Sequence, residues 1–380
     1  GRRVIDVQNH PLHVVSYSLP FEGVVKREAL LPHLHTHKRL PDAIPFVFKY
    51  YDRDWGLCLP QNLKITLNDE AYKVVIRTRF EIGTLKVGEV VVPGETDQCF
   101  MMAAHLCHPA MVNDDLTGCV VGLEAARALL DGPKPYYTYR LLILPETIGS
   151  LAYLSHHEEL IPKMVGGLFL EMLGADIPHI LQHSFLPDSQ VDRCFASALA
   201  TFDPGSTRKP YRDVIGNDER QFNAPGVRVP MLSLSRCLYP RTASDYPYRE
   251  YHSSMDTPTL VDQGRLEASR DLVLKMLAAW EKNRYIMNEF RGEIFCSGQN
   301  LWIDPAVNEV GHRTLFDVME RCDGTRTPAE IAIELQISFQ TVWEIVSLLL
   351  KRRLVRLSSQ PAAGQCPQES ETLSKPRHCK

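Results

Sequence analysis

Nearly continuous apolar runs alternate with stretches of helical periodicity in the middle of the chain. Three such runs occur, at residues 98–106, 139–146 and 165–174. Each has polar residues close to its carboxyl end. Residues 117–132 have helical spacing and end at Gly132, and residues 264–284 form a further helical stretch. Apolar strands that alternate with helices indicate a mostly parallel sheet. The pattern therefore predicts an α/β domain over residues 98–290.

The first 97 residues have a different pattern. Residues 4–18 alternate apolar and polar side chains, as a half-buried strand does. A helical stretch follows at residues 27–37, and the pattern predicts further strands around residues 63–67, 72–83 and 88–94. We expect residues 1–97 to form a small β-rich domain.

The C-terminal part is helical. Residues 314–324, 327–337 and 338–353 read as three helices separated by short turns, and residues 354–359 can form a strand. This order predicts a small winged-helix domain over residues 293–357. Its exposed acidic residues suit DNA phosphates poorly, so we expect it to contact a protein partner or form a homo-oligomer. Residues 358–380 are rich in Pro, Ser and Gln, and we expect them to be disordered.

Charge and cysteine content exclude several classes of protein. The 380 residues include 42 Lys+Arg and 46 Asp+Glu, a net charge of −4, which disfavours binding to nucleic acid. No run approaches about 18 uninterrupted apolar residues, so we expect no membrane span. The ten cysteines are spread singly, which favours free thiols and a cytoplasmic location.

The N-terminal end carries neither Met nor a leader of charged and then apolar residues. The sequence therefore predicts no signal peptide. It also predicts that an N-terminal piece of the protein precedes Gly1.

Polar residues follow the predicted strands at their carboxyl ends, where ligands bind in open α/β sheets. Zinc takes imidazole nitrogen and carboxylate oxygen as ligands, and a separate carboxylate must accept the proton of the attacking water. Any one of these residues could equally be an ordinary polar group at the end of a strand. Five such residues at one edge of the sheet favour a metal site. The candidate ligands are His105, Asp114, Glu171 and His252, and Glu146 is the candidate base.

The motifs around these residues resemble those of the zinc aminopeptidase superfamily that includes bacterial leucyl aminopeptidases and glutaminyl cyclases. Its H-x-D, D-N-x-S-G, E-E, D-M-x-G and late-His motifs have counterparts that begin at His105, Asp114, Glu146, Glu171 and His252. Residues 217–230 resemble the substrate-side loop of those enzymes. The resemblance covers about residues 98–285 and implies a zinc-peptidase fold of the phosphorylase/hydrolase-like type.

A narrower resemblance extends over nearly the whole chain. The segments HLCHP…NDDLTG, PETIGS, NDERQF and EYHSSMDT are similar to an uncharacterised bacterial and archaeal aminopeptidase-like family. Members of that family carry a β-rich insert and a C-terminal winged helix. This resemblance implies that part of the catalytic domain lies before Gly1.

Two departures from the superfamily pattern affect the expected number of metal ions. Thr147 replaces the second Glu of the E-E pair, and Thr is a poor zinc ligand; Cys107 replaces the Asp that orients the metal-bound His. We therefore expect one zinc ion rather than two, and we expect Cys107 to pack as a small core residue. His108 can replace His105 as a ligand or donate a hydrogen bond to an oxyanion, and we place His105 first.

The expected activity is zinc-dependent hydrolysis of a peptide or an aminoacyl amide. Glu146 would act as the base, and His108 or Tyr251 would help to stabilise the oxyanion. A substrate α-amine would need a carboxylate partner, for which Asp218, Glu219 and Glu250 are candidates. The alternative is an aminopeptidase-like protein that has lost catalysis and acts as a binding or regulatory module through its winged helix.

Overall fold

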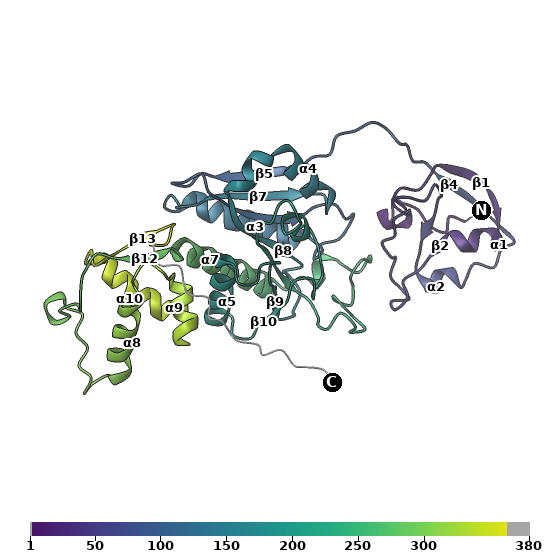
Figure 1. Cartoon of the computed structure of the whole chain (residues 1–380). Coiled ribbons are helices and arrows are strands. Elements are labelled where there is room, and N and C mark those ends of the chain that lie inside the picture. Colours follow the sequence, from purple (N-terminus) through teal and green to yellow (C-terminus); the bar gives the residue numbers. More distant parts are fainter. Residues whose placement is uncertain (1, 363–380) are drawn as a thin grey trace, which may run out of the picture. The chain divides into compact units, whose positions relative to one another are not determined.

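The computed structural model describes residues 2–362 of the chain. These residues divide into two compact units (Figure 1). The first unit comprises residues 1–192 and 205–275, and the second comprises residues 193–204 and 276–380. The helices α5 (Gln190–Phe202) and α7 (Gln263–Lys282) contribute residues to both units. No helix in residues 2–362 is both long and apolar enough to cross a membrane.

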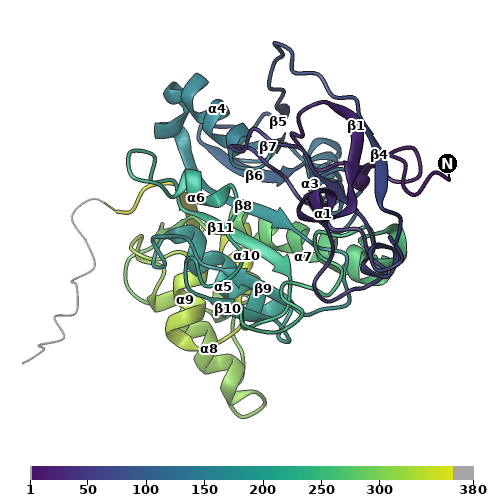
Figure 2. The same cartoon turned by 90° about the vertical axis from the view of Figure 1, so that its right-hand side faces the viewer.

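A seven-stranded sheet is the centre of the first unit, in the order β10-β9-β11-β8-β6-β7-β5 (Figure 2). Four central strands run parallel: β6 (Cys99–His105), β7 (Thr138–Leu144), β8 (Met164–Glu171) and β11 (Met231–Arg236). The outer strands are β5 (Gly88–Val92), β9 (His179–Gln182) and β10 (Thr207–Lys209). Because β5 is antiparallel to β7 and β9 is antiparallel to β11, the sheet is mixed at its sides. The prediction of an α/β fold with a mostly parallel sheet is confirmed.

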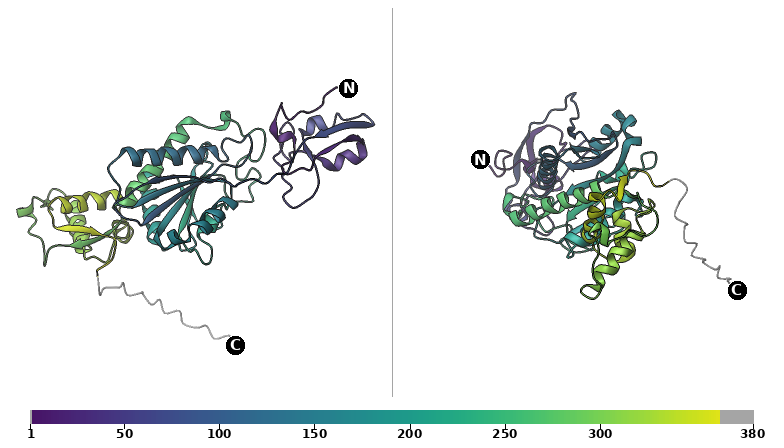
Figure 3. Two further views of the ribbon diagram at one scale, coloured as in Figure 1. Left: turned by 90° about the horizontal axis from the view of Figure 1, so that it is seen from above. Right: turned by 90° about the vertical axis from the view of Figure 1, so that its left-hand side faces the viewer.

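Helices cover both faces of this sheet (Figure 3). All seven residues of β6 are buried, and alternate ones face opposite sides. Met101 and Ala103 belong to a cluster with Tyr153 and Leu154 of α4 (Ile148–His156). The other face packs against α3 (Leu116–Asp131), where a Cβ on Gly122 would lie 2.8 Å from Leu141. A strand buried on both faces needs apolar residues throughout, which explains the continuous runs in the sequence.

The β-rich part of the first unit contains two small sheets. The strands β1 (Phe21–Lys26) and β4 (Ala71–Ile76) are antiparallel, whereas β2 (Leu34–His35) and β3 (Leu57–Cys58) are parallel. Two four-residue helices accompany them, α1 (Arg27–Leu30) and α2 (Gln61–Lys64), with 3-10 turns at Pro11–His13 and Leu31–His33. Their core gathers apolar side chains from both sheets and both short helices, among them Leu30, Leu34, Leu59, Val74 and Ile76.

Three local predictions for the β-rich part are wrong. The strand predicted at residues 4–18 is a 3-10 turn and isolated bridges, because Pro11 lacks an N–H and begins the turn. The strand predicted at residues 63–67 is replaced by α2 and a turn. β5, which lies inside the predicted range of the β-rich domain, is instead an edge strand of the seven-stranded sheet. Alternation along a short segment does not reveal which partner strand it meets.

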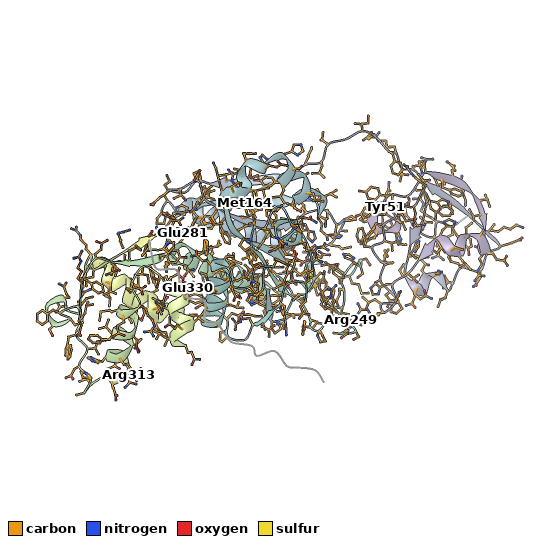
Figure 4. The ribbon with its side chains drawn as sticks, in the orientation of Figure 1. Tyr51, Met164, Arg249, Glu281, Arg313 and Glu330 are labelled. Atoms are coloured by element: carbon orange, nitrogen blue, oxygen red, sulfur yellow. The ribbon has the colours of Figure 1, made fainter. Side chains whose placement is uncertain are left out.

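Between β12 and the last described residues, the second unit contains three α-helices and one small sheet. The helices are α8 (Glu309–Glu320), α9 (Pro328–Leu335) and α10 (Phe339–Lys351), and β12 (Tyr285–Asn288) pairs antiparallel with β13 (Val355–Ser358). Thr327 and Glu330, the latter labelled in Figure 4, form a capping box that fixes the start of α9. The three helices and the final strand follow the predicted order, and the winged-helix assignment stays a prediction.

Smaller elements complete the described chain. They are α6 (Glu219–Phe222) and the 3-10 turns at Glu158–Lys163, Pro258–Leu260 and Ser297–Gln299. At the C-terminal end, the N–H of Ala362 donates to the carbonyl of Gly324. The sequence predicts disorder over residues 358–380. From residue 363 onward this prediction lies outside the described residues.

Candidate metal centre

The carboxyl ends of β6 and β8 bring two of the predicted ligands together. His105 ends β6 and Glu171 ends β8, and His105 Nε2 lies 3.9 Å from Glu171 Oε1. Asp114, in the loop after β6, places Oδ1 at 3.1 Å from His105 Nε2. All three side chains are at most 2% exposed. Parallel strands end at the same edge, so residues far apart in sequence meet here.

A second group of side chains also lies close to Asp114. His252 Nε2 is 3.2 Å from Asp114 Oδ2, and His108 Nδ1 is 3.9 Å from Asp114 Oδ1. The ligand atoms of His108, Asp114 and His252 lie within 4.8 Å of one another, as do those of His105, Asp114 and Glu171. The structure thus offers two sets of three donors that share Asp114. His105 and His108 each belong to a set with Asp114, and the choice between them as the ligand stays a prediction.

The donor atoms fit a divalent cation. Asp114 Oδ2, Glu171 Oε2 and His252 Nε2 are buried and make no hydrogen bond. Buried polar atoms without a partner carry a large desolvation cost, which a bound cation would offset. Burial and the neighbouring carboxylates raise the pKa of Glu171 well above its ordinary range. Imidazole nitrogen and carboxylate oxygen are the donors that zinc prefers.

Asp256 holds the loop that carries Asp114. Its carboxylate accepts hydrogen bonds from the backbone N–H groups of Val112 (3.3 Å), Asn113 (2.8 Å) and Asp114 (3.1 Å). The hydroxyl of Tyr248 donates a further bond of 2.8 Å. Asp256 is fully buried, so these four bonds are shielded from water. The sequence identified Asp256 only as part of a motif, and its distance of more than 140 residues from the loop hid this role.

Asp115 joins the ends of three elements. Its Oδ1 accepts the N–H groups of Gly118 and Met172, both at 3.0 Å, and its Oδ2 accepts that of His105 at 3.3 Å. These bonds tie the end of β6 to the start of α3 and to the end of β8. A Cβ on Gly118 would lie 2.4 Å from the carbonyl oxygen of Leu170, so only glycine fits there. The NDDLTG segment is therefore as much a structural junction as a source of ligands.

Glu146 lies at the rim of the centre. It follows the end of β7, its side chain is 32% exposed, and its Oε2 is 3.9 Å from His108 Nε2. The next residue, Thr147, has a φ of 64°, in the left-handed region that a β-branched residue rarely adopts. Such strain persists where surrounding contacts impose it, often at functional sites. The side chain predicted as the base is thus partly exposed to solvent and close to His108 of the second donor set.

Asp218 supplies the contacts that hold Thr147. Its Oδ1 accepts the Thr147 N–H at 2.8 Å and the Ser150 hydroxyl at 2.5 Å, which fixes the start of α4. Burial raises the pKa of Asp218 to about 6. Asp218 is 0% exposed. Its contacts make it a positioning residue for the Glu146–Thr147 turn.

Glu219 is also buried and faces away from solvent. Its Oε2 accepts the Asn217 N–H at 2.8 Å, and its Oε1 accepts the Gln182 side-chain amide at 3.2 Å. The amide of Asn217 in turn donates to Glu171. Both oxygens of Glu219 are therefore engaged within the protein. The substrate-binding roles expected for Asp218 and Glu219 stay predictions, and the contacts favour a structural role.

Tyr251 and Cys107 flank the histidines. The ring of Tyr251 stacks on that of His252, with centroids 3.8 Å apart and an interplanar angle of 15°. Cys107 Sγ lies 3.8 Å from His105 Nδ1 and 3.7 Å from His108 Nδ1. Cys107 lies near His105 as expected, but its side chain is exposed, so the expectation that it is a core residue is wrong. The chain turns outward directly after β6 ends, which brings this side chain to the surface.

The chain is similar to proteins of known sequence and structure. The family described as "Domain of unknown function (DUF4910)" matches residues 14–283. A Clostridium acetobutylicum protein, named "Putative polysaccharide biosynthesis protein with aminopeptidase-like domain", is 34% identical over 298 residues. The aligned part is 76% of this chain and 64% of that protein, so the chain spans less than two thirds of this relative.

Solved structures share the fold. A structure titled as a putative peptidase from Clostridium acetobutylicum has a TM-score of 0.83 and 29% identity, over 94% of this chain and 81% of that one. A zinc aminopeptidase from Bacillus subtilis has a TM-score of 0.50 and 15% identity, over 64% of this chain and 62% of that one. The second likeness concerns the fold alone. The expected resemblance to the zinc aminopeptidases is confirmed, and the chain belongs to the DUF4910 family.

Proposed function

We propose that this protein is a metal-dependent hydrolase of amide bonds, with aminoacyl amides or peptides as its substrate class. One observation carries the proposal: two sets of three donors share Asp114, and the partly exposed carboxylate of Glu146 lies 3.9 Å from His108 of one set. The aminopeptidase-like fold and the name of the Clostridium relative support it. A centre of this kind needs buried ligands and a base that water can reach, and the two sets and Glu146 meet these requirements.

The residues divide into ligands and a base. His105, Asp114 and Glu171 would hold one zinc ion, and His108 and His252 with Asp114 would hold a second. A bound divalent cation supplies Lewis-acid chemistry, which lowers the pKa of water and polarises a carbonyl. This assignment makes His108 a ligand in place of the Glu that Thr147 replaces. It also replaces the expected single zinc ion with two, because His108 supplies the third donor of the second set.

Glu146 performs the proton transfers. Its carboxylate accepts a proton from the attacking water and gives the proton to the leaving amine. Its partial exposure lets water and substrate approach, while Asp218 fixes the turn that carries it. Tyr251, which lies against His252, is the candidate donor of a hydrogen bond to the tetrahedral oxyanion.

The decisive experiment replaces Glu146 with Gln. The variant should keep its zinc, measured by elemental analysis, and lose about a hundredfold or more of its activity on aminoacyl amides. The matched control is Glu158→Gln, which alters an exposed glutamate at the surface turn after α4. Unchanged hydrolysis by Glu146→Gln would exclude the proposed base.

The same samples separate catalysis from the alternative function. A chelator should abolish hydrolysis, and zinc should restore it. A wild-type protein that retains no zinc and responds to no amide substrate would instead support the binding or regulatory module. Acetylation of the substrate amine reports whether the enzyme is an aminopeptidase, because an aminopeptidase loses activity on the blocked substrate.

A further inference from the structure

Four aromatic side chains form a continuous row that ends at the candidate metal centre. We call Phe46, Phe48, Tyr50 and Tyr17 the aromatic ladder. The centroids of Phe46 and Phe48 are 5.8 Å apart, and those of Phe48 and Tyr50 are 4.4 Å apart with the rings nearly stacked. Tyr17 meets Tyr50 edge-on at 4.8 Å. Residues 46, 48 and 50 alternate along an extended segment, so their side chains share one side of it.

Backbone hydrogen bonds fix the segment that carries the aromatic ladder. The N–H of Lys49 donates to the carbonyl of Ser16 at 3.0 Å, and that of Ser16 donates to Val47 at 2.9 Å. Closer to the centre, the N–H of Phe46 donates to the carbonyl of His252 at 2.7 Å. Tyr17 has a φ of 68°, which costs energy for a bulky residue. The rings are therefore held in place before any ligand arrives.

The inner end of the aromatic ladder touches two candidate ligands. The ring of Phe46 meets His108 at 5.1 Å and His252 at 5.3 Å, edge-on in both cases. The outer end is open, because Phe48 is 45% exposed and both Tyr50 and Tyr17 are 54% exposed.

We propose that the aromatic ladder binds the leaving-group side of the substrate and selects an aromatic or large apolar group there. This inference rests on the proposed hydrolase function. The group that gives a proton to the leaving amine must lie next to that amine. His108 contacts Phe46 and lies 3.9 Å from Glu146, so the ladder begins on the side of the proton donor.

The chemistry of the rings selects the class of ligand. Phe46 packs against a buried apolar cluster, the ring contacts of Phe48, Tyr50 and Tyr17 are with other rings, and the nearby Lys49 is paired with Asp54. A sugar would also need free polar side chains for its hydroxyl groups, whereas an apolar or aromatic group needs only the ring faces. Exposed aromatic rings that form no core contact are favourable anchors for such groups.

Two substrates with the same amino acid test the proposal. Leucine anilide and leucinamide differ only in the leaving group, so the ratio of their kcat/KM values reports selection on that side. Tyr50→Ala should lower this ratio about fivefold to tenfold, as expected for one lost aromatic contact. Tyr50→Phe should restore most of it, because the ring remains. The control is Phe295→Ala, which removes an exposed ring from the second unit.

A binding measurement shows whether the inference about the aromatic ladder fails or the proposed hydrolase function fails. Calorimetry on Glu146→Gln, with and without Tyr50→Ala, measures the preference for leucine anilide over leucinamide without turnover. A Tyr50-dependent preference without hydrolysis by the wild type would overturn the hydrolase function and support the aromatic ladder. Hydrolysis with an unchanged ratio, or an equal loss on both substrates, would overturn the ladder alone.

The remaining outcomes also decide the matter. Absence of any Tyr50-dependent binding preference would overturn the inference. Tyr51, labelled in Figure 4, is 96% exposed and adjoins the ladder, so this surface could instead contact a second copy of the chain. Size-exclusion chromatography tests that case: a change of oligomeric state in Tyr50→Ala with unchanged selectivity would overturn the proposed substrate contact.

Discussion

Replacement of Asp256 with Asn should loosen the loop that carries Asp114. Asp256 Oδ1 accepts the N–H groups of Val112 and Asn113, and Oδ2 accepts that of Asp114 and the Tyr248 hydroxyl. Asn has one acceptor oxygen, and its NH₂ group cannot accept a hydrogen bond. With the oxygen toward Asn113, the N–H of Asp114 loses its acceptor.

The size of the effect follows from these bonds. A hydrogen bond to a charged acceptor contributes about 1.5–3 kcal/mol, and a buried donor left unpaired costs about 1–3 kcal/mol. Asn should therefore lower the free energy of local opening by about 2–3 kcal/mol. Since 1.4 kcal/mol corresponds to a factor of ten, amide exchange in the loop should accelerate about 30- to 150-fold. Asp256→Ala loses all four hydrogen bonds, so it should accelerate amide exchange in the loop more than Asp256→Asn does.

Hydrogen–deuterium exchange of metal-free protein is the suitable assay, because a chain with two compact units need not unfold in one step. Peptides that cover residues 106–118 report the loop. Asp271→Asn is the matched control, since Asp271 is an exposed carboxylate of α7 that pairs with Arg270. Unchanged exchange in the loop, or equal acceleration throughout the chain, would refute the role assigned to Asp256.

Two further predictions concern His108 and Glu219. His108→Ala should lower the zinc retained after dialysis and weaken binding at least tenfold, because it removes a donor from one set; unchanged zinc content would exclude His108 as a ligand. Burial raises the pKa of Glu219 from 4.5 to about 7. The folded protein then keeps a proton that the unfolded chain has released, so the contribution of Glu219 to stability is greatest below about pH 4.5 and is lost as pH rises to about 7. The loss is on the order of 3 kcal/mol. Glu219→Gln should remove this slope in denaturant unfolding of metal-free protein at pH 5 and 7, and an equal slope in both proteins would contradict it.

The central strands could be predicted because their environment is simple. β6 and β8 are covered on both faces, so their apolar runs are unbroken until His105 and Glu171, where the strands end. The same logic located the edge of the sheet at which the candidate ligands meet. The helices of the second unit were also predictable, because caps such as Ser338 and Thr327 mark their starts in the sequence.

The remaining features depend on contacts that the sequence pattern does not record. His108 joins Asp114 because of the path of the loop after β6, and no periodicity describes such a loop. Asp256 reaches the same loop across more than 140 residues. The aromatic ladder depends on the hydrogen bond that places Phe46 beside His252, which the sequence does not record.

The bond between Phe46 and His252 has a thermodynamic consequence. The adjacent segment adds two more links, from Ser254 N–H to the Ile44 carbonyl at 2.8 Å and from Ile44 N–H to the Ser254 hydroxyl at 2.9 Å. One piece of backbone therefore carries a candidate metal ligand, and its hydrogen-bonded neighbour carries aromatic rings. Any molecule that binds the rings and alters this segment changes the affinity for the cation by some factor. By reciprocity, the cation changes the affinity for that molecule by the same factor, so occupancy of the two places is a single coupled equilibrium.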